Sequence, residues 1–290
     1  MSSCAAPRVA FIFNPLQRRD ECRCITYQGR RNDIACLSCT FVFHERKERC
    51  EICERNVAFP LFETAIRKEN TMQTFDTPAP IAAVLDVPAG RVQIIAADRV
   101  DTVVDIRPSN ASKSRDVQAA ERATTEYADG VLRIGLPDEK QYFGPSGSVE
   151  VTVQLPAGSR AEVQAASTEF RAVGRLGDID FDGAYRRIKI DEAAAVRLTA
   201  VDGDVEIGRL GGPAEITTAR GDIRIAEAAR GKVVLRTQQG DISIGAATGV
   251  SAALEASSWG SVSNSLKNDG TVELDIHATT SQGAIAARSL

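Results

Sequence analysis

The 290-residue chain contains no apolar stretch of 18 residues, the length that a membrane-spanning helix requires. The apolar stretch Val9–Phe13 is too short for the hydrophobic region of a signal peptide. Acidic residues outnumber basic ones, and the net charge of −4 is not that of a general nucleic-acid binder. We therefore expect no membrane span, no nucleic-acid partner and a cytoplasmic location.

Histidine is scarce, and motifs typical of enzymes are absent. The two histidines are His44 and His277, and His277 shares one face of an alternating segment with Glu273 and Asp275. We interpret it as an exposed strand residue. No serine lies in a nucleophile-elbow context, and the glycines form no phosphate-binding loop. The sequence predicts that the protein is not an enzyme and identifies no small-molecule substrate or cofactor.

The distribution of cysteine and glycine changes sharply near Met72. All seven cysteines precede Glu54, whereas only one of the 22 glycines precedes Met72. Either residues 1–71 are an appended module, or Met72 is the natural start and the upstream segment is a mis-assigned gene start; the second interpretation explains the break better. We expect a mostly irregular segment 1–71, a β region with one short helix over 72–160, and a repeat region over 161–290.

The cysteines contain the strongest metal-binding pattern. Two Cys-x2-Cys pairs are separated by ten residues, and each pair can form one knuckle of a tetrahedral zinc site. However, the pairs lack the glycine and proline residues that tighten such knuckles. Structural zinc is a hypothesis that would make the protein a zinc-dependent regulator, and disulfides are not expected without an export signal. The four ligands would be Cys36, Cys39, Cys50 and Cys53.

A repeat of Gly-Asp-hydrophobic-x-hydrophobic fills the last part of the chain. Clear copies begin at Gly203, Gly221 and Gly240, and weaker copies begin at Gly260 and Gly283. Each unit also has a strand before its glycine, so that one unit reads strand, turn, strand, turn. Such units bury their apolar faces only by stacking on one another. The equivalent core positions would form a column of Val205, Ile223, Ile242, Val262 and Ile285.

This pattern predicts an all-β protein whose main part is a parallel β-solenoid with rungs of about 18–20 residues; a β-sandwich is the alternative. Before the repeats, Pro88–Gly90 and Pro156–Gly158 suit corners between strands. The charged, alanine-rich segment Ser114–Tyr127 predicts the short helix, ended by Asp129-Gly130. We expect Trp259 to cover the flank of the solenoid, or else to anchor a partner.

The segment 76–290 resembles the bacterial putative-adhesin domain family, a β-strand-repeat domain of unknown function. The resemblance rests on Leu155–Ser159, on the copies Ala219–Ile223 and Gln238–Ile242, on Glu126–Leu132 and on Thr279–Ile285. It implies a solenoid-like β fold without established catalytic residues. The adhesin label implies a cell-surface role, which is the alternative to the cytoplasmic location.

Two sets of aspartates invite a functional interpretation. Asp204, Asp222 and Asp241 recur in register, and stacked carboxylates could bind calcium, but one aspartate per 18 or so residues favours a turn-capping role. The residues Asp178, Asp180 and Asp182 alternate on one strand face and could serve a carboxylate-lined enzyme that acts on polysaccharide.

The leading hypothesis is a non-catalytic binding, scaffold or self-assembly module. A solenoid has end rungs with unpaired strand edges, and such edges promote self-association unless they are capped. We therefore expect a protein partner or self-association, as a homo-oligomer or a filament. The unit Gly283–Ala287 has small residues at its core positions and is expected to be the cap or docking end.

The first prediction concerns residues 1–71. Intact mass and bound zinc should be measured together on protein purified from the cells that produce it. A mass that corresponds to a start at Met72 is expected, with no zinc bound, because the cysteines would then be absent. A full-length mass with one zinc per chain would instead establish the cysteine-rich module.

Overall fold

The computed structural model describes residues 26–28, 34–36, 72–136, 147–183 and 187–290. The chain forms two compact units, Met1–Glu63 and Thr64–Leu290. In the first unit, β1 (Thr26–Gln28) and β2 (Ile34–Cys36) form an antiparallel pair.

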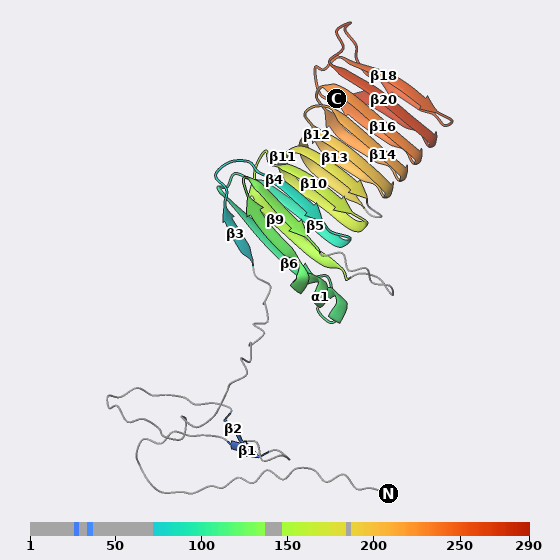
Figure 1. Ribbon diagram of the computed structural model, residues 1–290. Coiled ribbons are helices and arrows are strands. Elements are labelled where there is room, and N and C mark those ends of the chain that lie inside the picture. Colours follow the sequence, from blue (N-terminus) through green and yellow to red (C-terminus); the bar gives the residue numbers. More distant parts are fainter. Residues whose placement is uncertain (1–25, 29–33, 37–71, 137–146, 184–186) are drawn as a thin grey trace, which may run out of the picture. The chain divides into compact units, whose positions relative to one another are not determined.

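The second unit consists almost entirely of short strands, as the alternation of apolar and polar residues predicts (Figure 1). Its first part contains one helix, and each later strand is paired in parallel. The elements are β3 (Gln73–Asp76), β4 (Ala82–Asp86), β5 (Ala89–Ala97), β6 (Asp101–Pro108), α1 (Ser114–Arg122), β7 (Thr124–Ala128), β8 (Val131–Gly135), β9 (Val149–Pro156), β10 (Arg160–Ala165), β11 (Ser167–Gly183), β12 (Ile188–Asp202), β13 (Val205–Leu210), β14 (Ala214–Arg220), β15 (Ile223–Ala228), β16 (Gly231–Gln239), β17 (Ile242–Ala246), β18 (Ala252–Ser258), β19 (Val262–Ser265), β20 (Leu274–Gln282) and β21 (Ile285–Ser289).

The strands stack into two faces that enclose one apolar core. Face A contains, in spatial order, β7, β8, β4, β10, the ends of β11 and β12, β14, β16, β20 and β18. Face B contains β3, β6, β9, β5, the starts of β11 and β12, β13, β15, β17, β21 and β19. One rung contributes a strand to each face, so the predicted parallel β-solenoid is confirmed.

Four of the five residues of the predicted core column are buried, whereas Val262 is exposed, and the order of the last two members is reversed. Val205 pairs with Ile223, and Ile223 pairs with Ile242. Ile285 then follows Ile242, and Val262 lies beyond Ile285 at the end of the stack. The rung of β20 and β21 therefore inserts between two rungs that precede it in the chain. The repeat fixes which residues are equivalent, but it does not fix the side on which a late strand joins the stack.

The unit that begins at Gly283 is consequently internal, and its predicted role as the end of the solenoid is wrong. Ile285 and Ala287 are 1% and 2% exposed, because β19 covers their open side. The rung of β18 and β19 forms that end instead. The same exchange occurs at the other end, where β8 and β9 pair outside β4 and β5.

The short helix is present but ends earlier than the sequence predicts. α1 stops at Arg122, and Thr124–Ala128 forms β7, which pairs antiparallel with β8. Asp129 and Gly130, with φ of 51° and 76°, form the hairpin turn rather than a helix end. The β-branched pair Thr124-Thr125 favours a strand over a helix.

Glycine is required where one rung turns onto the next. A Cβ atom added at Gly240 would lie 2.1 Å from the carbonyl oxygen of Gly221, and Gly240 has φ of 149°. Gly221 has the same relation to Gly203, at 2.2 Å. The turn backbones therefore stack in direct contact, and this contact explains the repeated glycine that dominates the sequence pattern.

Hydroxyl side chains complete these turns from the neighbouring rung. Thr237 donates to the carbonyl oxygen of Gly221 at 3.2 Å, and Thr280 donates to that of Gly240 at 3.0 Å. Both threonines are buried, so these bonds satisfy polar groups that water does not reach.

We predict that Gly240→Ala destabilises the solenoid by at least about 2 kcal/mol, because steric overlap with Gly221 adds to backbone strain. Gly249→Ala is the matched control, since Gly249 has φ of 83° but no atom within 4 Å of its added Cβ. The control should cost about 1 kcal/mol. Urea unfolding followed by circular dichroism measures both, and equal losses would contradict the stacking argument.

Candidate functional site

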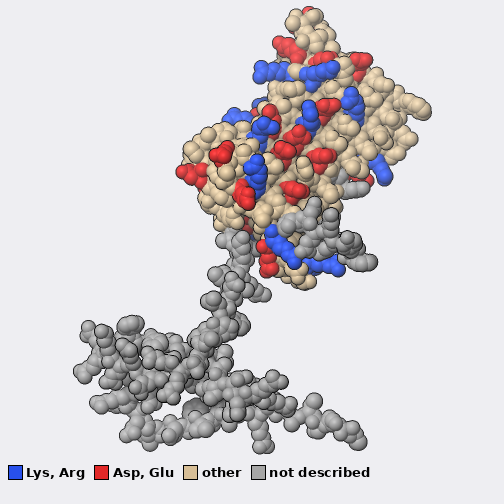
Figure 2. All heavy atoms as spheres, in the orientation of Figure 1, with Lys and Arg blue, Asp and Glu red and all other residues tan. Residues whose placement is uncertain are grey.

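The outer surface of the solenoid carries mixed charges in rows that follow the rungs (Figure 2). Alternation along each strand directs every second side chain outward, and parallel pairing places equivalent residues side by side. Many outward cations form ion pairs with carboxylates on the neighbouring rung. The pairs are Arg91–Glu169 at 3.2 Å, Lys189–Glu206 at 3.2 Å, Arg209–Glu227 at 3.3 Å and Arg236–Glu215 at 3.5 Å.

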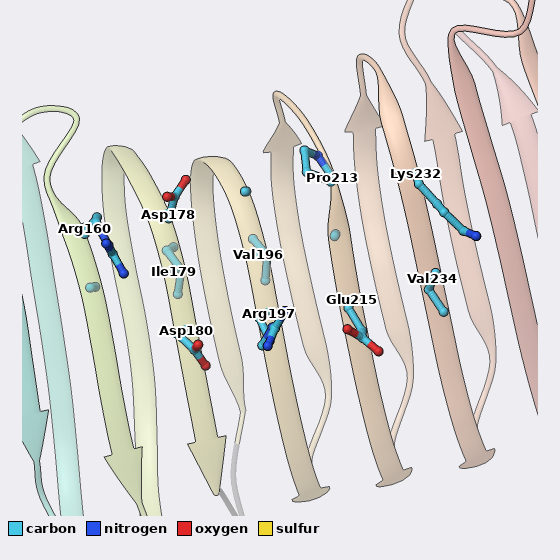
Figure 3. Close-up of a pocket in the computed structure, with 13 residues that line it drawn as sticks. Arg160, Asp178, Ile179, Asp180, Val196, Arg197, Pro213, Glu215, Lys232 and Val234 are labelled. Atoms are coloured by element: carbon cyan, nitrogen blue, oxygen red, sulfur yellow. The ribbon is translucent and has the colours of Figure 1, made fainter.

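Face A contains a shallow depression of about 440 Å³ that crosses the strands β10, β11, β12, β14 and β16 (Figure 3). Its outward side chains alternate in sign from strand to strand. Asp180, Arg197 and Glu215 are register neighbours on three successive strands. Arg160 and Asp178 lie on β10 and β11, and Lys232 and Val234 lie on β16, in the same depression.

Most charges of this depression lack partners within the protein. Arg160, Arg197, Lys232, Asp178 and Asp180 make no side-chain hydrogen bond or ion pair with any described residue, whereas Glu215 pairs with Arg236. All of these side chains are exposed. The depression thus offers charged groups of both signs, held at strand spacing, to a ligand outside the chain.

The three aspartates of the enzyme hypothesis lie on the outer face of the second half of β11. Asp178 and Asp180 line the depression, and Asp182 lies outside its lining. All three are exposed. A carboxylic acid that donates a proton to a leaving group is usually held in an apolar site that favours its protonated form. The surroundings of these aspartates do not supply such a site.

The recurring turn aspartates bind the backbone of the next rung. The Asp204 carboxylate accepts the N–H of Asp222 at 3.0 Å, and the Asp222 carboxylate accepts the N–H of Asp241 at 2.9 Å. The Asp241 carboxylate accepts the N–H of Ala284 at 2.7 Å. The aspartates therefore cap backbone N–H groups, as expected, but these groups belong to the neighbouring rung and not to the aspartate's own turn. No group of three or more metal-ligating side chains occurs among the described residues.

The remaining sequence candidates lie apart from one another. His277 projects from the outer face of β20, where it contacts Asp275 at 2.9 Å and Glu255 at 3.0 Å. It is a strand-face residue as predicted, but it is half-buried rather than exposed. Cys36 ends β2, whereas Cys39, Cys50 and Cys53 lie outside the described residues, so the zinc site stays a prediction.

Two carboxyl groups have lowered pKa values, and both lie away from the depression. The hydrogen bond from Arg99 lowers the pKa of Asp101, near the first rungs. The Thr271 N–H, and then the Ser251 hydroxyl, lower the pKa of Asp269 in the segment that follows β19. Both carboxylates are thereby fixed by local hydrogen bonds, Asp101 at the start of β6 and Asp269 in the loop before β20.

Trp259 lies in the turn between β18 and β19, and its side chain is 96% exposed. The expectation that it covers the flank of the solenoid is therefore wrong. The turn places Trp259 at the corner of the end rung, where its side chain cannot pack against the buried residues of the core. The alternative interpretation, an anchor for a partner, remains a prediction.

The fold and its turns define the class of the protein: a parallel β-solenoid whose rungs join through stacked Gly-Asp turns. The model of the family described as Toastrack DUF4097 matches residues 84–288. The chain belongs to this family, and the resemblance drawn from the sequence is confirmed. No curated protein matches the sequence.

The chain is similar to several solved structures at low sequence identity. A putative adhesin from Bacteroides fragilis NCTC 9343 is 13% identical, with a TM-score of 0.47, over 76% of this chain and 97% of that one. A putative cell adhesion protein from Clostridium sporogenes ATCC 15579 is 12% identical (TM-score 0.36; 77% and 100% coverage). A putative lipid binding protein from Parabacteroides distasonis ATCC 8503 is 14% identical (TM-score 0.40; 74% and 96% coverage). No helix within the described residues is long and apolar enough to cross a membrane.

We predict that Asp222→Ala destabilises the solenoid by about 1 kcal/mol, because the N–H of Asp241 loses its acceptor. Asp222→Asn keeps an oxygen acceptor and should recover most of this stability. The comparison is made by urea unfolding. If the asparagine variant were as unstable as the alanine variant, the charge rather than the hydrogen bond would account for the effect.

Proposed function

We propose that this protein is a non-catalytic binding module that engages a protein partner through the depression on face A. The supporting observation is the contrast between the charges on this surface. Arg91, Lys189 and Arg209 pair with carboxylates of neighbouring rungs. Arg160, Arg197 and Lys232, by contrast, lie together in one depression and make no ion pair with any described residue. Rigid strands hold these groups in place, so a ligand would meet an ordered array.

The mixture of signs favours a polypeptide over a polyanion. Nucleic acids and other phosphate-rich polymers would be repelled by Asp178 and Asp180, which lie between the cations. A protein surface or extended peptide carries both signs and can match such an alternation. The depression is also open and shallow, which suits a macromolecular surface better than a small substrate, because small ligands are usually enclosed.

The proposal predicts that a photo-crosslinking amino acid at Val234, inside the depression, captures a defined partner in the cells that produce the protein. The same amino acid at Val100, which is 66% exposed and lies in the turn between β5 and β6, is the matched control. A partner captured at position 234 and not at position 100 is the expected result.

Reversing the charge of selected cations then distinguishes specific binding at the depression from non-specific binding to charged surfaces. Arg197→Glu combined with Lys232→Glu should abolish the crosslink, because both unpaired cations change sign. Lys189→Glu combined with Arg209→Glu reverses two paired cations on face B and should leave it intact. Equal loss in both double variants, or equal capture at positions 234 and 100, would overturn the proposal.

A further inference from the structure

The end rung formed by β18 and β19 has strand edges that are open except at the start of β18, where the Ala252 N–H donates to the carbonyl oxygen of Lys267 at 2.9 Å. β18 pairs only with β20, and β19 pairs only with β21, among the described residues. The carbonyl oxygen of Ser251 accepts the N–H of Leu274 at 3.2 Å and thus faces β20. Because successive backbone groups alternate in direction, Leu254 and Ala256 direct their N–H and C=O groups to the open edge.

The apolar core extends into this rung, and its last apolar side chains are partly exposed to solvent. Val262 is 48% exposed, although the equivalent Ile285 and Ile242 are 1% exposed. Leu254 is half-buried, whereas its neighbour Ile276 is fully buried. Trp259 stands almost fully exposed at the corner of the same rung. Open edges and exposed apolar residues together mark a surface that a second strand pair would complete.

The opposite end of the solenoid is closed by a different arrangement. β6 covers the edge of β9 and β7 covers the edge of β8, both in antiparallel pairing. The rings of Phe75 and Tyr127, from β3 and β7, lie 5.5 Å apart and bring the two faces together. β7 runs antiparallel to β8, and β6 runs antiparallel to β9, so the strands added at this end do not form another parallel rung.

We propose that the end rung docks on the end rung of a second copy of this chain and forms a closed, twofold-symmetric dimer. The twofold axis is perpendicular to the long axis of the solenoid, so the two copies stack end to end in opposite orientations. The strands that meet at the interface are therefore antiparallel, and each sheet face of one copy continues into a face of the other. The other end does not offer the same surface, because its outermost face A strand, β7, runs antiparallel to the rung that it follows. Assembly therefore stops at two copies, rather than continuing as a filament.

Charge selects which strands meet. The outward Glu255 lies at the middle of β18, so pairing of β18 with its own copy would place two carboxylates together. β19, with the sequence Val262–Ser265, carries no charge. Each β18 therefore pairs with β19 of the other copy. With this pairing the twofold axis is parallel to the strands, so the Trp259 residues of the two copies lie at the same end of the interface.

The area of the end rung determines how tightly the two copies are expected to associate. A strand of seven residues, such as β18, is about 23 Å long, and the faces are separated by about 10 Å. The contact thus buries less than the roughly 800 Å² per partner of a standard interface. We expect a reversible dimer that dissociates on dilution in the micromolar range.

Sedimentation of the full chain under reducing conditions, over a range of concentrations, tests the proposal. The protein should pass from monomer to dimer and no further as concentration rises. Trp259 is the only tryptophan, so its fluorescence reports on this corner and should shift to shorter wavelength as the dimer forms. A species larger than a dimer, a monomer at all concentrations, or a dimer without a fluorescence shift would overturn the proposal.

Two variants test the surface directly. Val262→Lys places a charge at the end of the core column and should weaken association at least tenfold, because a second rung would have to bury it. Val201→Lys is the matched control: Val201 is also 48% exposed but lies in an internal rung. Unfolding by urea confirms that both variants remain folded, and the single change Trp259→Ser provides an independent test at an exposed side chain. A dimer unaffected by both Val262→Lys and Trp259→Ser would refute the assignment of the surface.

Discussion

The contact between stacked turns is the constraint on which the rest of this solenoid depends. At Gly221, Gly240 and Gly283 the backbones of successive turns approach so closely that no Cβ atom fits. This contact fixes the rung spacing, and it places the carboxylate of each turn aspartate against the N–H of the next. Buried threonines satisfy the turn carbonyl groups. Strand pairing, core columns and surface rows all follow from the resulting register.

The same register explains why the outer surface is a candidate for binding. Parallel rungs without offset place equivalent side chains in straight rows, so a charge on one rung meets its neighbour at a fixed spacing. Several rows use this spacing for ion pairs, which contribute about 0–1 kcal/mol each at an exposed surface. In the depression on face A, Arg197 and Asp180 are register neighbours that do not form an ion pair, and Arg160 and Lys232 are unpaired beside them.

Both ends of the solenoid depart from the repeat, and they do so differently. Antiparallel strands and an aromatic pair, Phe75 and Tyr127, close the core at one end. At the other end the core narrows from Ile285 to Val262, and the last rung keeps free edges. A stack with one closed end and one open end differs from a uniform repeat in its assembly, because an open edge is a site for one more strand pair.

The sequence by itself determined the parallel β-solenoid, the residues that are equivalent in successive rungs and the role of the turn aspartates as acceptors for backbone N–H groups. It could do so because these features repeat along the chain and depend on local spacing. Only the tertiary structure decided the order of the final rungs, the exposure of Trp259 and the end of α1 at Arg122. These depend on which edge a strand joins and on what remains uncovered. These long-range features leave no periodic pattern in the sequence, because equivalent rungs have similar sequences and could each pair with the same neighbouring strand.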